Sequence, residues 1–427
     1  MKQFISTYIL LFACFISCAQ TLERVHQPLY YRAYIELVSK QNLGYAAEKL
    51  NIGIAEAKIK AAQVFNDPTI SVEYGDNDDR RMQMGRSAAV ELSKTFSIGK
   101  RSADIDLAKS EKALSEALLN DYFHNLRAEA TLAYLEAVKQ TELYRVKEDS
   151  YENMRQLAQG DSIKHALGNI TKVDAVQSIL EAEMSHNELM QAQTELYNSY
   201  ASLALWTGAF SRDTLYVPTG TLYLAERVFD ADNLLTMALE NRADLAAALK
   251  NADVARKALT VAQRERGTDF DLAVGYNYNT EVRNEIAPAP KFNGITVGIS
   301  IPLKLSNLNR GALHTAELQA QQAEINYRQA ELEVQNSVMQ SVRKYLSLSE
   351  QVGRYNNGLL ANAQSVVDGK MYAYDRGETS LLEVLNARRT YDDLRTTYIE
   401  TLYNQAAALV ELERNVGIWD ITLFFTP

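Results

Sequence analysis

Hydrophobic and polar residues alternate in four short stretches of the chain, and this alternation predicts two β-hairpins. The first pair of stretches covers residues 69–74 and 90–98, with a polar turn at 75–87 between them. The second pair covers residues 270–279 and 295–303. Apolar side chains occupy every second position, so each predicted strand has one apolar face and one polar face.

Elsewhere the apolar residues recur at every third or fourth position, which predicts long helices. One stretch, 101–159, contains neither proline nor glycine, and as a single helix it would be about 85 Å long. The other predicted helices cover 31–64, 168–206, 241–266 and the residues from 309 onward. Rods of this length exceed what a compact domain needs.

The predicted helix after residue 309 carries two separate apolar lines. One is a seam with spacings of three and four residues, formed by Ala316, Ala320, Ala323, Tyr327, Ala330 and Val334. The other recurs every seven residues, at Leu318, Ile325, Leu332, Met339 and Leu346. Two such lines predict a neighbouring helix on each side, with coiled-coil packing. Gly353 and Gly358 predict a bend or a junction, because each glycine weakens a helix by about 1 kcal/mol relative to alanine.

Two segments of the chain resemble each other, which indicates an internal duplication. Residues 168–178 align with residues 377–387 without a gap. In both, a glycine is followed by polar residues that can cap a new helix and then by an acid, Asp174 or Glu383. We therefore divide the chain into repeat one at about 31–208, a linker at about 209–232 and repeat two at about 233–418.

The N-terminus has the pattern of a secretory signal peptide. A short basic start is followed by a mostly apolar run at 5–16 and by the small-residue exit Ser17-Cys18-Ala19. The run is shorter than the roughly 18 residues that a membrane span needs. We expect residues 1–19 to be removed after Ala19, leaving 20–427; the alternative is a lipoprotein acylated on Cys18. Both cysteines lie in this leader, so no disulfide and no cysteine metal site is expected after it.

Composition excludes several functional classes. The formal net charge of −10 and the pI of about 5.2 argue against a nucleic-acid-binding surface. The 5 histidines show no ligand spacing, and no nucleophile elbow or phosphate-binding loop is found. The acidic residues fall on predicted amphipathic helices, where such charges are mostly solvated. We therefore predict no enzyme activity, no catalytic residue, no cofactor and no metal site.

The apolar face of each predicted hairpin needs a cover. Strands of about 9–11 residues with one apolar and one polar face are typical of outer-membrane barrels. Four strands cannot close a barrel, so closure requires several copies of the chain. The alternative is a soluble periplasmic sheet packed on the helices, which leaves the long helices without a purpose.

Several short motifs, in order along the chain, resemble the TolC-like outer-membrane efflux proteins, and the resemblance covers about 31–417. They lie at 66–70, 96–101, 241–245, 299–303, 309–311 and 374–388. The resemblance implies a mainly α fold with a membrane β-barrel: a duplicated repeat of helices and β-hairpins that forms a homotrimer. Four strands per protomer would make a twelve-stranded barrel that continues into a long periplasmic helical tunnel.

The resemblance also implies a function, a location and partners. The chain would be the outer membrane channel of a tripartite efflux system, extending into the periplasm as a passive exit duct. It would dock to a periplasmic adaptor protein and to an inner-membrane pump of the RND or ABC type, and contact outer membrane lipid. The motifs look most like the heavy-metal cation efflux branch, with drug efflux and type I protein secretion as alternatives. A different class, a surface-anchored coiled-coil scaffold, would require that the alternating stretches do not enter a membrane.

Family members often constrict the periplasmic end with carboxylates, and this implies four gate candidates here. Glu383 falls on one acidic position, and Asn386 falls on another where an aspartate is common. Asp174 and Tyr374 match residues that hold relatives closed, so we expect a hydrogen bond from Tyr374 to Asp174. The chain departs from the pattern at Thr379, where relatives carry an arginine. The alternative for Asp174 and Glu383 is an ordinary solvated helix face.

Overall fold

The computed structural model describes residues 25–79, 82–208, 214–223, 227–303 and 309–419. The predicted signal peptide, with Cys18, lies outside the described residues. The chain forms two compact units. Unit 1 comprises Met1–Ala46, Phe123–Asn241 and Gln335–Pro427, and unit 2 comprises Ala47–Tyr122 and Arg242–Val334.

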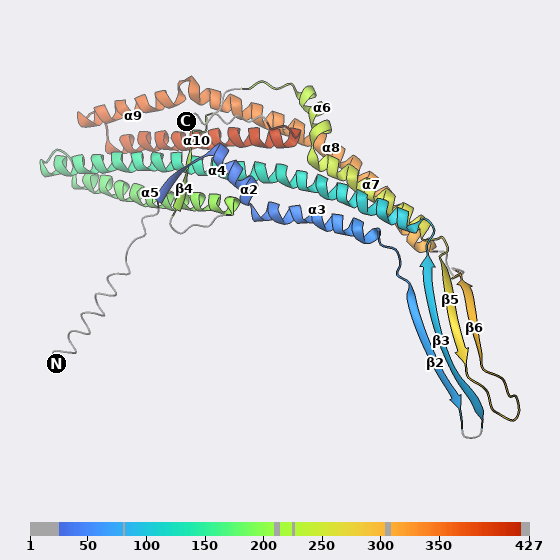
Figure 1. Ribbon diagram of the computed structural model, residues 1–427. Helices are drawn as coiled ribbons and strands as arrows, with labels where there is room; N and C mark the ends of the chain where they lie inside the picture. The colour runs from blue at the N-terminus through green and yellow to red at the C-terminus, as the bar shows by residue number, and fades with distance from the viewer. Residues whose placement is uncertain (1–24, 80–81, 209–213, 224–226, 304–308, 420–427) are drawn as a thin grey trace, which may run out of the picture. The chain divides into compact units, whose positions relative to one another are not determined.

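Unit 2 contains an antiparallel sheet with the strand order β2-β3-β5-β6 (Figure 1). The two predicted hairpins are confirmed as β2 (Thr69–Asp78) with β3 (Gln83–Phe96), and β5 (Phe270–Asn279) with β6 (Phe292–Ser300). The last strand ends earlier than expected, before Pro302, which has no N–H group to donate to a ladder.

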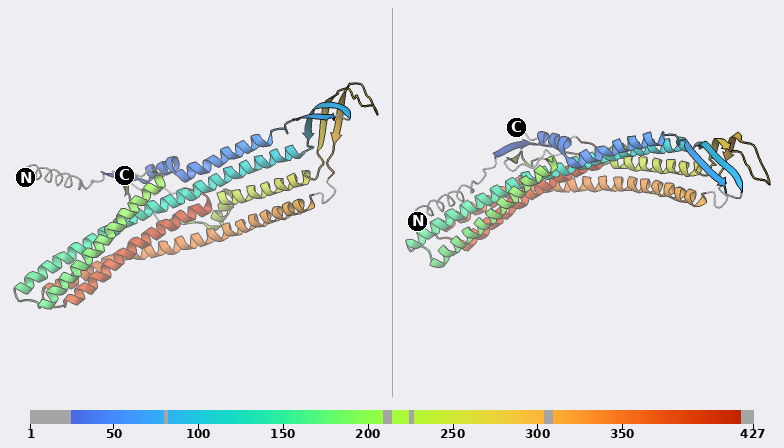
Figure 2. Two further views of the ribbon diagram at one scale, coloured as in Figure 1. Left: turned by 90° about the horizontal axis from the view of Figure 1, so that it is seen from below. Right: turned by 60° about the horizontal axis from the view of Figure 1, so that its bottom comes forward.

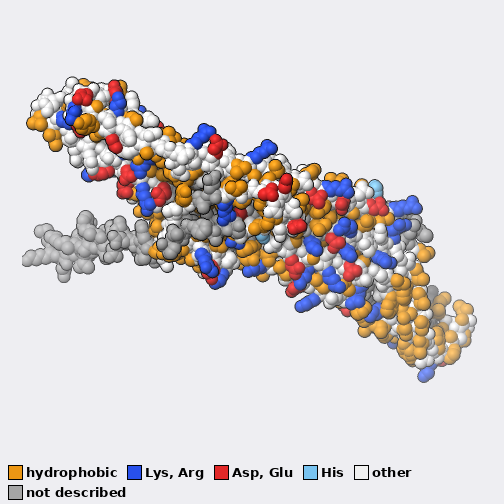
Figure 3. Space-filling model, turned by 90° about the horizontal axis from the view of Figure 1, so that it is seen from above, with side chains coloured by type: hydrophobic (Ala, Val, Ile, Leu, Met, Phe, Trp, Pro, Cys, Tyr) orange, Lys and Arg blue, Asp and Glu red, His pale blue; other side chains and the backbone are white. Residues whose placement is uncertain are grey.

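The register of this sheet gathers its apolar side chains on one face. Ile70, Leu92, Val274 and Val297 lie side by side across the four strands. The next such row is Val72, Val90, Tyr276 and Ile295, and every member of both rows is exposed. Figure 3 shows hydrophobic side chains densely gathered there. Within the described residues, β2 and β6 pair on one side only, so the sheet has two open edges.

The helices of unit 2 pack through small side chains. They are α7 (Ala243–Arg264), most of α3 (Leu43–Ala62), and the first parts of α4 (Lys100–Ala166) and α8 (Arg310–Arg354). Among the described residues, the buried apolar side chains of this unit are Leu245, Val334 and nine alanines: Ala55, Ala103, Ala108, Ala243, Ala247, Ala252, Ala262, Ala316 and Ala323. Alanine permits a close approach of helix axes.

The two apolar lines predicted on the last of these helices have different surroundings. Ala316, Ala323 and Val334 of the first line are buried. All members of the second line, Leu318, Ile325, Leu332, Met339 and Leu346, are exposed. The described residues therefore bury the first line and leave the second line exposed.

Unit 1 buries larger side chains, among them Tyr34, Tyr134 and Tyr345. It contains α2 (Tyr31–Gln41), α5 (Lys172–Thr207), α6 (Ala231–Asn241), α9 (Leu360–Asp375) and α10 (Leu381–Val416), with the later parts of α4 and α8. A π-helical turn at Tyr355–Leu359 joins α8 to α9, and Gly358 has a φ of 101° there. The junction predicted at this glycine is confirmed, whereas Gly353 lies within α8.

One predicted helix is divided, another begins two residues later than predicted, and one sheet was not predicted. The helix expected over 31–64 breaks at Asn42, whose side chain accepts the Tyr45 N–H (2.9 Å) and donates to the Trp206 carbonyl (3.1 Å). The helix expected over 241–266 begins at Ala243, because Arg242 is extended. A parallel sheet pairs β1 (Val25–Tyr30) with β4 (Thr214–Thr219). Its two strands lie far apart in the sequence, so no local pattern predicts that they pair.

Candidate functional site

The duplicated segments form two closely similar helix turns in unit 1. One joins α4 to α5 and the other joins α9 to α10. Gly168 and Gly377 have φ values of 78° and 75°, a conformation that side chains with a Cβ rarely adopt. Each following helix is capped as predicted, because Thr171 accepts the backbone N–H of Asp174 and Ser380 accepts that of Glu383. The aligned sequences therefore have the same local structure.

The four helices that meet at these turns share one small hydrophobic core. Its buried members are Met154, Leu157, Ala158, Ala182, Tyr374, Leu381, Val384 and Leu385. They come from all four helices, and the hairpins of α4 with α5 and of α9 with α10 lie side by side in both views of Figure 2. The two copies of the duplicated turn are thereby held together.

A buried hydrogen bond lies within this core. The Tyr374 hydroxyl donates to Oδ1 of Asp161 over 2.9 Å, joining α9 to α4. Asp161 is fully buried, and its second carboxylate oxygen has no hydrogen-bond partner among the described residues. Burial and, next, the bond to the Asp161 carboxylate raise the pKa of Tyr374 well above its usual value. The hydroxyl therefore remains a donor throughout the neutral pH range.

Lys164 reinforces the same junction. Its Nζ lies 4.4 Å from the centre of the Tyr374 ring and 2.9 Å from Oδ1 of Asp375. A cation over an aromatic ring is attracted by the negative face of the ring. One turn of α4 thus binds α9 through both a buried hydrogen bond and a partly exposed ion pair.

Further polar contacts link α10 to the first hairpin. Arg389 pairs with Glu181 of α5 (3.3 Å), and Arg395 pairs with Asp149 of α4 (2.8 Å). Ser150 donates to Asp392 over 2.7 Å. Four of these residues, Ser150, Glu181, Arg389 and Asp392, line a cavity of about 180 Å³ between the helices. The junction is therefore polar along much of its length, unlike the alanine-rich packing of unit 2.

The structure brings only some of the predicted residues together. The hydrogen bond that we expected from Tyr374 to Asp174 goes instead to Asp161, and the Asp174 carboxylate accepts the Thr171 hydroxyl at 2.7 Å. A phenol has one proton to donate, and Asp161 holds the buried position beside it. Arg376 follows directly after α9, three residues before Thr379, and its guanidinium stacks on the ring of Tyr372 in α9.

Glu383 and Asn386 lie on the exposed side of α10, three residues apart and so on one helix face. The Glu383 carboxylate accepts hydrogen bonds from Lys370 and from Thr379. These contacts, the Lys370 bond first, hold the pKa of Glu383 below its usual range. Glu383 is thus ionised at neutral pH and is paired with a cation of its own hairpin.

Sequence reasoning missed Asp161 and Lys164, although a signal for Asp161 existed. Met154, Leu157 and Ala158 form an apolar helical seam, and Asp161 falls on its next position. An acid in such a seam has to find a buried donor, because an unpaired buried polar group is costly. Lys164 lies one turn further on, and nothing in its sequence context marks it.

Two features are absent from the described residues. No cluster of three or more histidine, cysteine, aspartate or glutamate side chains there is able to hold a metal ion. In the same part of the chain, no helix is both long and apolar enough to cross a membrane.

Comparison of the sequence with known proteins identifies relatives. Residues 234–417 match the family described as outer membrane efflux protein. The chain is 25% identical over 395 residues to the cobalt-zinc-cadmium resistance protein CzcC of Cupriavidus metallidurans, covering 91% of this chain and 90% of that protein. It is 24% identical over 329 residues to the outer membrane protein TolC of Vibrio cholerae, covering 74% and 70%.

Solved structures share the fold. A crystal structure of CusC gives a TM-score of 0.76 at 18% identity, covering 91% of this chain and 92% of that one. The CmeC outer membrane channel of Campylobacter jejuni gives 0.74 at 16% identity, covering 90% and 85%. The predicted fold class agrees with these likenesses.

We expect Tyr374→Phe to lower the free energy of unfolding by about 1.5–3 kcal/mol, because the buried Asp161 carboxylate loses its donor. The raised pKa of Tyr374 means that this contribution is present at neutral pH and is lost only as pH rises through the folded-state pKa. Denaturant unfolding of the detergent-solubilised protein measures the change.

Tyr372→Phe, at an exposed position of the same helix, is the matched control and should change little. In an Asp161→Ala background, Tyr374→Phe should cost far less than in the unmodified protein. Equal costs in the two backgrounds would show that the hydroxyl does not act through Asp161.

Proposed function

We propose that the chain belongs to the outer membrane efflux protein family, whose model matches residues 234–417, and that it is the outer membrane channel of a tripartite efflux system. It lies in the outer membrane and extends into the periplasm. It acts as a passive exit duct rather than as an enzyme. Within the chain, a leader at 1–19 precedes repeat one (about 31–208), a linker (about 209–232) and repeat two (about 233–418).

The exposed apolar face of the sheet in unit 2 is the observation that carries this proposal. Its two rows of apolar side chains fit the hydrocarbon of a bilayer, and the opposite face carries polar groups such as Glu91 and Asn277. Lipid does not tolerate the unpaired backbone groups of β2 and β6. Pairing them with other copies closes a barrel, and three chains supply twelve strands.

The exposed line on α8 supports the same assembly. Leu318, Ile325 and Leu332 recur every seven residues and are exposed in the part of the chain that the structure describes. A helix of a neighbouring protomer would bury them by coiled-coil packing. The trimer thus satisfies the strand edges and the open helix line together.

We expect the purified protein to be a trimer in mild detergent, with about three times the chain mass of 47.9 kDa less any leader. Native mass spectrometry measures this directly. Heating should dissociate the trimer and change its migration on gels, because the barrel then loses its inter-chain strand pairs. A stable monomer or dimer would rule out the closed barrel.

The partners are a periplasmic adaptor and an inner-membrane pump, of the RND or the ABC type. Near the two helix turns, Ile163, Leu167, Val173 and Leu382 are exposed large apolar side chains. Exposed apolar residues of this kind are suited to contacts with another protein. They support docking of the adaptor at this end of the helices of unit 1.

We propose heavy-metal cations as the exported substrate. Relatives named for cobalt, zinc and cadmium resistance and for cation efflux cover most of the chain. The similarity to TolC, over 74% of the chain, keeps drug efflux and type I protein secretion as alternatives. In the heavy-metal case, the passive duct carries what its pump selects and needs no metal site of its own.

Deleting this protein from its native host should make the cells more sensitive to cobalt, zinc or cadmium salts, because the exit route is lost. Growth in graded metal concentrations measures this, and the unmodified gene on a plasmid is the control. Unchanged metal tolerance with new sensitivity to antibiotics would instead indicate drug efflux.

The helix turns of unit 1 form the periplasmic gate in this proposal. Asp161, Tyr374 and Lys164 hold the two hairpins together and so favour a closed state. Asp174 caps its helix beside them, and Glu383 with Asn386 lines the constriction. Each Glu383 is paired with Lys370, so a ring of three carries three compensated charges rather than three free ones.

We expect Glu383→Gln to lower the cation preference of single channels, because Lys370 is left without its anion. Lys370→Gln should raise that preference for the opposite reason. Reversal potentials in planar bilayers measure both, and Glu195→Gln, at an exposed site further along α5, is the control.

Since the pKa of Glu383 is lowered, the wild-type cation preference should persist until pH falls below the usual carboxylate range. Identical selectivity in both variants would remove Glu383 from the constriction.

A further inference from the structure

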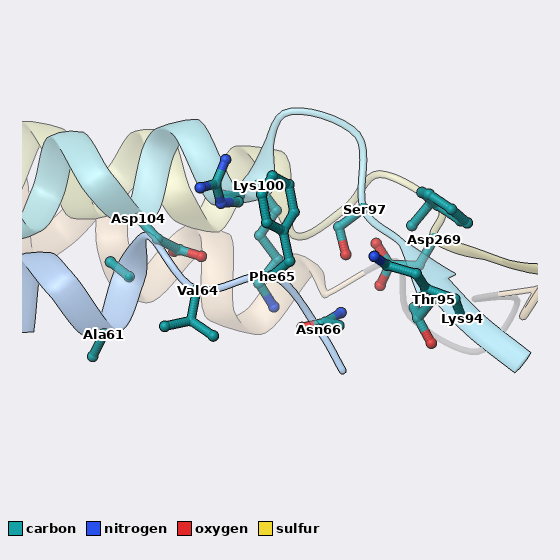
Figure 4. A pocket seen from close by; sticks show the side chains of 13 residues that line it. Ala61, Val64, Phe65, Asn66, Lys94, Thr95, Ser97, Lys100, Asp104 and Asp269 are labelled. Carbon is teal, nitrogen blue, oxygen red and sulfur yellow. The ribbon is translucent and has the colours of Figure 1, made fainter. Parts of the chain in front are cut away.

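A second cavity lies within unit 2, where β3 passes into α4 and where the chain leaves α3 for β2. Its volume is about 470 Å³, within the range of small-molecule sites. In Figure 4, Phe65 stands in the middle of the lining, with Asp104 on the helical side and Lys94, Thr95 and Asp269 on the strand side. The cavity therefore combines an aromatic ring with groups of both charges.

The position of Lys94 places this cavity at the end of the apolar sheet face. In β3, Lys94 is two residues from Leu92 and four from Val90, so the three side chains share one face. A lysine on a lipid-facing surface extends its ammonium group to the level of the headgroups. Beyond Lys94, Phe96 stacks on Phe270 with ring centres 5.3 Å apart, and the strand ends.

Three cations line the cavity; Lys100 is paired with Glu265 (3.2 Å), and the other two lie around an exposed aromatic ring. The Arg101 guanidinium lies 3.9 Å from the centre of the Phe65 ring, and Lys94 Nζ lies 5.6 Å from it. Arg101 also donates to the Gln63 carbonyl, which fixes its orientation. Lys94 has no acidic partner among the described residues. One oriented and one unpaired cation are thus available to a phosphate.

The acids of the same cavity are also available. Asp104 and Asp269 line it, and neither has a hydrogen bond or an ion pair through its side chain among the described residues. Two carboxylates without partners in the same cavity disfavour an anion as the whole ligand. They suit a ligand that carries an ammonium group near its phosphate.

We propose that this cavity binds the headgroup of phosphatidylethanolamine in the periplasmic leaflet of the outer membrane. Lys94 and Arg101 contact the phosphate, and Asp269 accepts hydrogen bonds from the ammonium group. The acyl chains run from Phe96 along the apolar sheet face. The inference rests on the proposed function, because that function places the sheet in the membrane.

Titration of the purified protein with three lipids, followed by native mass spectrometry, tests this proposal. Phosphatidylcholine has the same charge as phosphatidylethanolamine but no N–H donors, and phosphatidylglycerol has no ammonium group. We expect phosphatidylethanolamine to bind most tightly of the three. Asp269→Asn should abolish its advantage over phosphatidylcholine, and Lys94→Gln should weaken both lipids about fivefold.

Matched controls lie on the exposed surface of α4: Asp106→Asn and Lys109→Gln should leave all three affinities unchanged. Equal affinity of the unmodified protein for phosphatidylethanolamine and phosphatidylcholine would overturn the proposal, as would the tightest binding of phosphatidylglycerol or unchanged binding in both test variants. A trimer that conducts ions but lacks the lipid preference would refute this inference alone. Absence of a trimer would instead refute the proposed function.

Discussion

The two outer strands of the sheet in unit 2 present backbone donors and acceptors that the described residues of one chain do not pair. In water such edges are a risk of aggregation, and in lipid each unpaired group costs several kcal/mol. The apolar face of the same sheet has to be covered by lipid or by protein. The sheet therefore needs both partners for its edge strands and a cover for its apolar face. A barrel closed by several copies meets them together. The oligomer is therefore a consequence of hydrogen bonding as much as of hydrophobic burial.

The helices of unit 2 also leave apolar side chains that a neighbouring chain can bury. Within unit 2, alanines such as Ala252 and Ala323 let helices approach closely, and they bury little apolar area per residue. Larger side chains on the open line of α8, such as Ile325, are left for a neighbouring chain. The hydrophobic stabilisation is thus divided between contacts within the chain and contacts between chains.

The helix turns of unit 1 show how a duplicated motif acquires two different roles. Gly168 with Thr171, and Gly377 with Ser380, make the same backbone turn and the same cap. Three residues before the second glycine stands Tyr374, where the first copy has His165. Tyr374 points its hydroxyl at Asp161 of the other copy. The residues that the two copies share form the turns, and a residue in which they differ, Tyr374, joins the two turns.

Local patterns in the sequence were sufficient for the hairpins, the long helices, the junction at Gly358 and both capped turns. These features depend on the period of apolar residues or on the φ preference of glycine. Both signals can be read from residues that are close together in the sequence. Tertiary structure decided what depends on partners far along the chain. Asn42, where a predicted helix breaks, donates a hydrogen bond to the distant Trp206 carbonyl, and β1 pairs with β4. The Tyr374 hydroxyl donates to Asp161 and not to Asp174, the acceptor expected from the sequence. A hydrogen bond has a single donor proton and a narrow range of distances, so packing of the helices selects the acceptor, and the one-dimensional pattern cannot.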